Sequence, residues 1–405
     1  MTSTTSRTPR VPAPRRPRRT ATADGRTPWG AVVALGVGIF ALVTAEFLPA
    51  SLLPRLAADL GITEGVAGQA VTATALMGIV AAPTVGLLFP RMDRRTLLAG
   101  LLGLAIVSDV LVATAPAFWV VLLSRLLLGI SLAGFWGLAP SVTAKLAAPQ
   151  HLGRAMMVAN AGMPLATVTA VPVGTFLGET WGWRPVFWLA VGVTAVALVL
   201  LLLLVPRSAP TGSPSLRSLG ETLRSRVLLL GLGGIVLVAG GHFTAFTYIR
   251  PAVERVPGIT PGQIALLLSV LGVASVFGNL AAGAAADRHL RAALLTSPLL
   301  IGLGTASVGL FSGEFVAVVV ATGVWGLAFG SLPTLVQTWL ARTAPDRVEQ
   351  GAGLVTAMFQ VAIAVGAASG GLITDSAGVG TTYVVGAVAA IAGGALLRAA
   401  STSRH

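Results

Sequence analysis

Three ionisable residues lie inside long apolar stretches of this 405-residue chain. Glu46 stands in VTAEFLPASLLP, Asp109 in VSDVLVA and Arg125 in LLSRLLLGISLAG. A charged side chain in bilayer hydrocarbon is costly unless it is paired, protonated or hydrated, so such residues often mark ion pathways and proton relays. Glu46 can bind and release a proton, and Arg125 can hold its negative charge. We therefore predict that Glu46 and Arg125 couple a proton to the protein's function.

The depth of these residues in the membrane is consistent with an ion pair to Arg125, but it does not determine which acid forms it. Glu46 and Arg125 each lie about 10 Å from one end of their apolar stretch, at 1.5 Å per residue. They can therefore face each other at similar depth. Asp109 reaches a similar depth and competes as the partner of Arg125. A purely structural ion pair that holds helices together is the alternative for either acid.

Amides and aromatics mark a second candidate site. Amides form hydrogen bonds without the cost of a charge and aromatic rings stack, so together they suit a neutral, planar, hydroxylated ligand. The predicted substrate cavity contains Trp136, Asn160, His242, Phe246, Tyr248, Gln337 and Gln360. Hydrogen bonds between helices and aromatics at the membrane surface are the alternative for any one of them. Because imidazole titrates near neutral pH, His242 is a second candidate proton site.

The elements that must position these residues are membrane helices. Hydrophobic residues make up 55% of the chain and charged residues 10%, and the mean hydropathy is +0.86. About 20 apolar residues are needed for a helix to cross about 30 Å of hydrocarbon. Twelve runs approach that length, at roughly 30–53, 65–89, 96–115, 118–146, 153–178, 185–205, 227–250, 262–286, 292–311, 315–342, 350–374 and 381–399. We predict an all-α membrane protein with twelve transmembrane helices.

The basic residues predict the orientation. If the N-terminus lies inside and the spans alternate, 22 of the 27 Lys and Arg residues fall inside and four outside, with Arg125 in a span. Basic residues collect on the cytoplasmic side of membrane proteins. We therefore expect both termini in the cytoplasm and attribute the net charge of +13 to topology rather than to nucleic-acid binding. The expected location is the inner (plasma) membrane.

Constant spacing between matching segments indicates an internal repeat. GLLFPRMDRR at 86–95 matches GAAADRHLR at 283–291, and FWGLAP at 135–140 matches AFGSLP at 328–333. Two six-helix repeats about a central cavity are an architecture for alternating access. The predicted parts are a disordered basic tail at 1–28, an N-terminal bundle at 29–205, a linker at 206–226, a C-terminal bundle at 227–399 and a tail at 400–405.

The sequence lacks the residue patterns of several kinds of functional site. There is no cysteine, so the chain has no thiolate metal site and no disulfide framework. The four His residues have no metal-ligand spacing, and no GxxxxGK[ST] loop is present. We expect neither a metal nor a cofactor, and no enzymatic activity. Without an ATP site, uphill transport would have to draw on an ion gradient.

The loop at 86–95 resembles the signature loop of the major facilitator superfamily, although Pro90 stands where that motif has Asp. Arg125 and Gly129 look like the fourth-span motif of its twelve-span drug:proton antiporters, and the stretch with Pro164 and Pro172 looks like their fifth-span motif. The resemblance covers the chain after about Trp29. The gating-loop residues that it implies are Gly86, Arg91, Asp93, Arg94, Arg95, Gly283, Asp287 and Arg288.

Four stretches of the sequence resemble one particular group of members within that superfamily. AEFLPASLLPRLAADLGITEGVAGQAVTATA at 45–75 and GFWGLAPSVTAKL at 134–146 resemble the members that export purine ribonucleosides. FTYIRP at 246–251 and WGLAFGSLP at 325–333 extend the likeness. The resemblance implies a monomeric proton-coupled exporter of inosine- and guanosine-type nucleosides. Sugar or drug export by the same mechanism is the alternative, and a membrane receptor without transport is the alternative of another class.

Overall fold

The computed structural model describes residues 26–210, 216–311 and 313–402, and the described part of the chain is helical without strands. The predicted tail at 1–28 therefore lies mostly outside the described residues, as do 211–215 of the linker and 403–405 of the C-terminal tail. In lipid every backbone N–H and C=O group needs an internal partner, and α-helices provide one within each span.

The N-terminal half contains seven helices. They are α1 (Trp29–Asp59), α2 (Glu64–Leu88), α3 (Arg94–Ala113), α4 (Phe118–Leu146), α5 (Leu152–Asn160), α6 (Gly162–Trp181) and α7 (Trp183–Leu204). Helices α5 and α6 together form one bent span, in which the segments Pro149–Ala170 and Pro172–Trp181 meet at 44°. Pro172 explains the bend, because proline removes a backbone donor and its ring displaces the preceding turn.

The C-terminal half follows a short linker helix, α8 (Leu216–Arg224), which the sequence did not predict. Its helices are α9 (Arg226–Phe246), α10 (Ile249–Val253), α11 (Pro261–Leu310), α12 (Phe315–Thr343), α13 (Val348–Ala377) and α14 (Val379–Thr402). The 50-residue α11 contains two spans, because His289 leaves the helical conformation (φ −134°, ψ 36°) and divides it. Nine helices of the described part are long and apolar enough to cross a membrane by themselves. Counting α5–α6 as one span, α11 as two and α2, whose apolar part is the shorter Thr72–Leu88, as one gives the twelve spans that the sequence predicts.

Local sequence explains where several helices begin. Asp93 accepts a hydrogen bond from Thr96 N at the start of α3, and Ser225 does so from Leu228 N at the start of α9. Thr260 and Gln263 form a reciprocal capping box at the start of α11. These side chains satisfy the backbone donors that the first turn of a helix leaves free.

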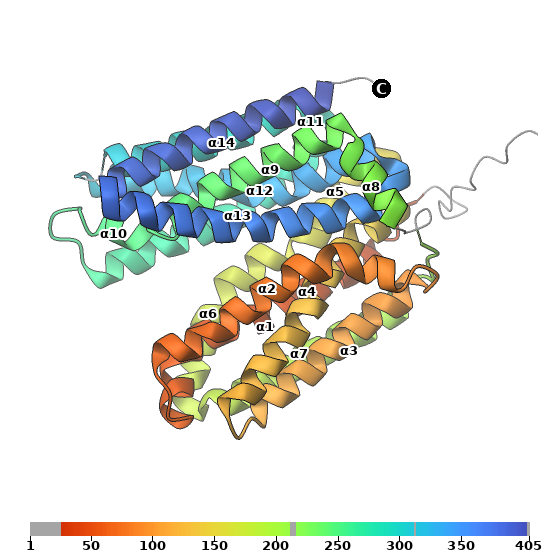
Figure 1. Cartoon of the computed structure of the whole chain (residues 1–405), viewed down its shortest axis with the longest axis horizontal. Helices are drawn as coiled ribbons and strands as arrows, with labels where there is room; N and C mark the ends of the chain where they lie inside the picture. The colour runs from red at the N-terminus through yellow and green to blue at the C-terminus, as the bar shows by residue number, and fades with distance from the viewer. Residues whose placement is uncertain (1–25, 211–215, 312, 403–405) are drawn as a thin grey trace, which may run out of the picture.

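Each half has a large apolar core of its own, and a small cluster of Leu152, Met156, Ala341 and Val348 packs between the halves. We call the end that holds residues 206–210 and α8 the linker end and the opposite end, where Asp59 and Arg184 pair, the far end. Contacts between the halves join α13 to α2 and α4, and α11 to α5 and α6. In Figure 1 the ribbons of the two halves approach beside α8 and separate toward α10.

Candidate functional site

The buried ionic cluster of the N-terminal half is centred on Arg125 of α4. Its Nη2 lies 3.7 Å from Oδ1 of Asp109 on α3, and both side chains are almost fully buried. Its Nη1 donates to the carbonyl of Ala45 on α1 at 3.0 Å. Arg125 also lies over the ring of Phe187 on α7, 5.5 Å from its centroid. One cation thus connects four helices.

Glu46 follows Ala45 and is the second acid of this cluster. Arg125 is electrostatically coupled to Glu46 as well as to Asp109, but its ion pair among the described residues is with Asp109. Glu46 is partly exposed, whereas Asp109 is fully buried. Both oxygens of Asp109 lack a hydrogen-bond partner in the described part of the chain. The structure therefore brings the predicted residues together and gives the two acids different surroundings.

A chain of polar side chains from α5, α11 and α12 joins the halves. Asn160 Nδ2 on α5 donates to Gln337 Oε1 on α12 at 2.8 Å and lies 3.2 Å from Thr334 Oγ1. Thr334 donates to Asn279 Oδ1 on α11 at 2.7 Å, and Asn279 Nδ2 donates to the carbonyl of Met157 on α5 at 3.0 Å. We call these five residues the amide bridge. Its members are separated by up to 180 positions, so their spacing alone did not reveal it.

Two further residues of the predicted cavity, Gln360 and Trp136, lie outside the amide bridge. Gln360 of α13 lies against α2, where a Cβ added at Gly78 would come within 2.8 Å of Gln360 Nε2. Trp136 of α4 is half-buried and packs against the core of the N-terminal half. Their role in binding a substrate remains a prediction.

Of the other predicted cavity residues, His242 and Phe246 belong to an aromatic cluster in the C-terminal half, and Tyr248 lies outside its ring contacts. His242 Nδ1 on α9 accepts a hydrogen bond from Trp325 Nε1 on α12 at 2.9 Å. Its ring is parallel to those of Phe329, at 3.4 Å between centroids, and Phe246, at 5.4 Å. The Tyr248 hydroxyl donates to the carbonyl of Ala367 on α13. This cluster is distinct from the ionic cluster, and sequence reasoning missed Trp325 and Phe329.

The predicted gating residues of the first loop separate into different environments. Arg94 is fully buried and forms an ion pair with Glu349 of α13, while its Nη1 donates to the carbonyl of Phe89 at 2.8 Å. Asp93 caps α3, and Arg95 donates to the carbonyl of Leu202 on α7. Arg91 is exposed. Sequence reasoning missed Glu349, because an acid at the start of a span is unremarkable.

The second predicted loop makes the matching contact. Asp287 Oδ1 of α11 accepts a hydrogen bond from Gly153 N at 2.6 Å, and its Oδ2 lies 3.3 Å from Arg154 N. These amides belong to the first turn of α5, where helix N–H groups favour a negative charge. Gly283 lets α11 approach Met157 of α5 closely.

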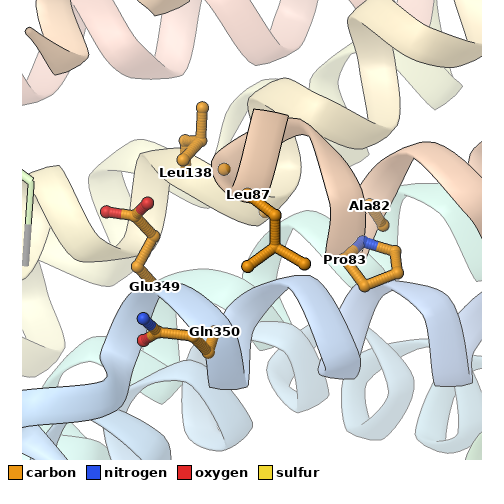
Figure 2. A pocket seen from close by; sticks show the side chains of 8 residues that line it. Ala82, Pro83, Leu87, Leu138, Glu349 and Gln350 are labelled. Carbon is orange, nitrogen blue, oxygen red and sulfur yellow. The ribbon is translucent and has the colours of Figure 1, made fainter. Parts of the chain in front are cut away.

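Beside Glu349 lies a small cavity between α2, α4 and α13. Its volume is about 10 Å³, which is about the room of one water molecule. Figure 2 shows Glu349 and Gln350 on one side of it and Pro83, Leu87 and Leu138 on the others. The halves therefore fit closely at the linker end.

The fold and these clusters define a membrane transporter with two similar halves. The Major Facilitator Superfamily matches residues 35–256 and 232–404, so the chain belongs to that superfamily. It is a multi-pass secondary transporter of small molecules and not an enzyme.

Three known proteins show how the chain compares. It is 35% identical over 363 residues to the transcription regulatory protein OpdE of Pseudomonas aeruginosa, covering 89% of this chain and 90% of that one. It is 34% identical over 362 residues to the purine ribonucleoside efflux pump NepI of Salmonella typhimurium, covering 88% and 90%. The structure of the transporter FucP in the outward conformation matches with a TM-score of 0.76 at 16% identity, over 94% of this chain and all of that one.

Proposed function

We propose that this protein is a proton-coupled antiporter that exports purine ribonucleosides of the inosine or guanosine type. The observation that carries the proton coupling is the position of Arg125, paired with Asp109 and bonded to the backbone beside Glu46. A cation shared by two acids responds to the protonation of either. The similarity to a purine ribonucleoside efflux pump over 88% of the chain supports the substrate class.

The linker end faces the cytoplasm in this proposal. The excess of Lys and Arg in the segments of that end supports this orientation, since basic residues collect on the cytoplasmic side. The hydrogen bonds and ion pairs described above between the halves gather toward the same end. The structure then corresponds to a state closed to the cytoplasm.

Opening to the cytoplasm would change the amide bridge. Asn160 Nδ2 now donates a hydrogen bond to Gln337 Oε1 across the halves. When the halves separate at the linker end, both amides become free to form hydrogen bonds with the ribose or base of a substrate. Substrate binding and closure would thus use the same side chains in alternating states.

A proton gradient supplies the energy in this mechanism. Glu46 is partly exposed, and in this mechanism its carboxyl group takes up and releases the proton. Neutralising Glu46 changes the charge that faces Arg125, so protonation and the arrangement of the helices around Arg125 are coupled. Alternation between the two states then exchanges a proton for a nucleoside.

Transport into proteoliposomes tests this proposal. Purified protein is reconstituted with an imposed pH gradient, and the uptake of labelled inosine, arabinose and chloramphenicol is compared. Inosine uptake that depends on the gradient is the expected result. Uptake of arabinose or chloramphenicol alone would assign the protein to sugar or drug export.

The similarity to OpdE supports one rival of another class, a membrane protein that regulates transcription. Deletion and complementation in the native host distinguish the two. An exporter should raise tolerance to 6-mercaptopurine riboside and lower its intracellular level. A regulator would change transcript levels without moving any of the three substrates in proteoliposomes.

A further inference from the structure

A basic groove of about 810 Å³ opens at the linker end of the C-terminal half, away from the contact between the halves described above. It lies where the irregular segment of α11, the last turn of α12 and the end of α14 come together. Its walls include Arg288, His289, Arg291, Trp339, Arg342 and Ala400. The proposed transport mechanism uses no residue of this groove as a ligand.

The internal repeat shows what occupies the corresponding place in the N-terminal half. Helices α4 and α12 both contain 29 residues and begin 197 positions apart, so Lys145 corresponds to Arg342. The same offset relates Arg94 to Arg291. Helix α7 begins 196 positions before α14, so its last residue, Leu204, corresponds to Ala400.

In the N-terminal half, the chain after α7 covers this place. Lys145 donates to the carbonyl of Ala209. The carbonyl of Ser208 accepts from Arg94 N at 2.8 Å, and Ser208 N donates to Asp93 Oδ2 at 2.7 Å. The backbone carbonyl oxygens of Ala209 and Ser208 thus accept hydrogen bonds from the Lys145 side chain and from the first turn of α3.

In the C-terminal half, the equivalent cations have no such cover from the described residues. Arg288 and Arg291 are exposed, and neither forms a hydrogen bond or an ion pair within the described part of the chain. Arg342 lies 3.6 Å from Asp287, which also interacts with α5. The groove therefore has an excess of positive charge.

A buried donor lines the same groove. Trp339 is 1% exposed, and its indole N–H has no hydrogen-bond partner in the described residues. An unsatisfied buried donor is costly, so an acceptor is expected beside it. The guanidinium groups that line the groove are donors that suit the oxygens of a phosphate group.

The surface below the groove is apolar. Leu299 and Leu303 of α11 are 38% and 51% exposed, and Ile391 of the adjacent α14 is 38% exposed. A lipid whose phosphate binds in the groove could lay its acyl chains along this face. Basic pockets between membrane helices bind anionic headgroups in other proteins.

We propose that this groove binds the phosphate headgroup of an anionic phospholipid from the leaflet at the linker end. The test is native mass spectrometry of delipidated protein to which phosphatidylglycerol or phosphatidylcholine is added. The groove variant is Arg288→Gln/Arg291→Gln. The matched control is Arg91→Gln/Arg224→Gln, which removes two exposed charges at the same end outside the groove.

Wild type and the control should retain phosphatidylglycerol in preference to phosphatidylcholine. The groove variant should lose affinity for phosphatidylglycerol by about fivefold for each arginine removed. Equal retention of phosphatidylglycerol by all three proteins would overturn the proposal.

A second arm distinguishes a lipid from a soluble anion. Thermal unfolding of delipidated protein is measured with inorganic phosphate at constant ionic strength. Stabilisation by phosphatidylglycerol but not by phosphate, lost in the groove variant, is the expected result. Stabilisation by phosphate alone would keep the phosphate site but overturn its assignment to a lipid.

Discussion

Arg94 and Glu349, 255 positions apart, form a buried two-pronged ion pair between α3 and α13. Arg94 Nε donates to Glu349 Oε2 at 2.9 Å, and an Nη group donates to the other oxygen. At the second contact, Asp287 of the α11 segment faces Arg154 of α5 at 3.9 Å. In both contacts the basic residue belongs to the N-terminal half and the acidic residue to the C-terminal half. An exact internal repeat would reverse this assignment in the second contact. Pro90 explains the difference, because it carries no acid at the position that corresponds to Asp287.

The Arg94–Glu349 pair should stabilise the state in which the halves meet at the linker end. Arg94→Gln removes the guanidinium group that pairs with the buried Glu349, and breaking a buried ion pair costs about 3–5 kcal/mol. We expect a lower unfolding temperature in detergent and reduced transport. The control is Arg91→Gln, because Arg91 belongs to the same loop and is exposed.

A double variant tests the pair itself. Arg94→Glu/Glu349→Arg exchanges the two charges and should recover part of the stability that either single variant loses. Equal unfolding temperatures for Arg94→Gln and Arg91→Gln would show that the pair contributes nothing to this state.

Asp287 should act through the first turn of α5. Asp287→Ala removes the acceptor of Gly153 N and the negative charge at a helix N-terminus, at a cost of about 1–2 kcal/mol. Asp287→Asn keeps an acceptor and should cost less. Asp346→Asn is the control, since Asp346 is exposed at the same end. The order of the three unfolding temperatures is the measurement, and a loss as large for Asp346→Asn as for Asp287→Ala would refute the helix-terminus role.

Hydropathy was sufficient to predict the spans, because a membrane helix must satisfy its own backbone and present apolar side chains to lipid. The bent fifth span was readable from Pro172. The division of α11 at His289 was hidden inside a helix, but the polar residues there already separated two apolar runs. The linker helix α8 was missed because its composition is polar.

The sequence was sufficient to identify the residues of the candidate site but not the contacts between them. Charges inside apolar runs identify Glu46, Asp109 and Arg125, since lipid makes such residues costly. Which acid pairs with Arg125 depends on the rotation of α1 and α3 about their axes, which composition does not determine. The hydrogen bond between Asn160 and Gln337 likewise depends on how the two halves meet.

The Asp59–Arg184 pair at the far end makes a pH-dependent contribution. The hydrogen bond from Arg184 holds the pKa of Asp59 below its ordinary value of 3.8. A lowered carboxyl pKa stabilises the folded state above the ordinary pKa, and the contribution is lost as the pH falls through the lowered value. The difference in unfolding temperature between wild type and Asp59→Asn should be small, because the pair is exposed, and should vanish in acid. A difference that grows with acidity would contradict the sign.

His242 should hold the aromatic cluster together through its bond to Trp325. His242→Phe keeps a ring against Phe329 but leaves the buried Trp325 N–H without its acceptor, at a cost of about 1–3 kcal/mol. His242→Asn can restore an acceptor and should recover part of that stability. The pH dependence of transport by His242→Asn is the decisive measurement. An unchanged profile is expected, whereas a lost pH dependence would make His242 a proton carrier.

The last prediction concerns the two acids that face Arg125. Glu46→Gln imitates the protonated form permanently, so it should abolish proton-driven export while nucleoside exchange without a gradient continues. Glu46→Asp keeps the carboxylate and should retain part of the activity with a shifted pH profile. Asp109→Asn instead removes the ion-pair partner of Arg125, and breaking this buried pair costs about 3–5 kcal/mol. Proton release on adding inosine, measured in detergent for wild type, Glu46→Gln and Asp109→Asn together with their unfolding temperatures, separates the two roles. We expect Glu46→Gln to remain stable and lose the release, and Asp109→Asn to lose stability. Full proton release from Glu46→Gln would move the proton site to Asp109 or His242.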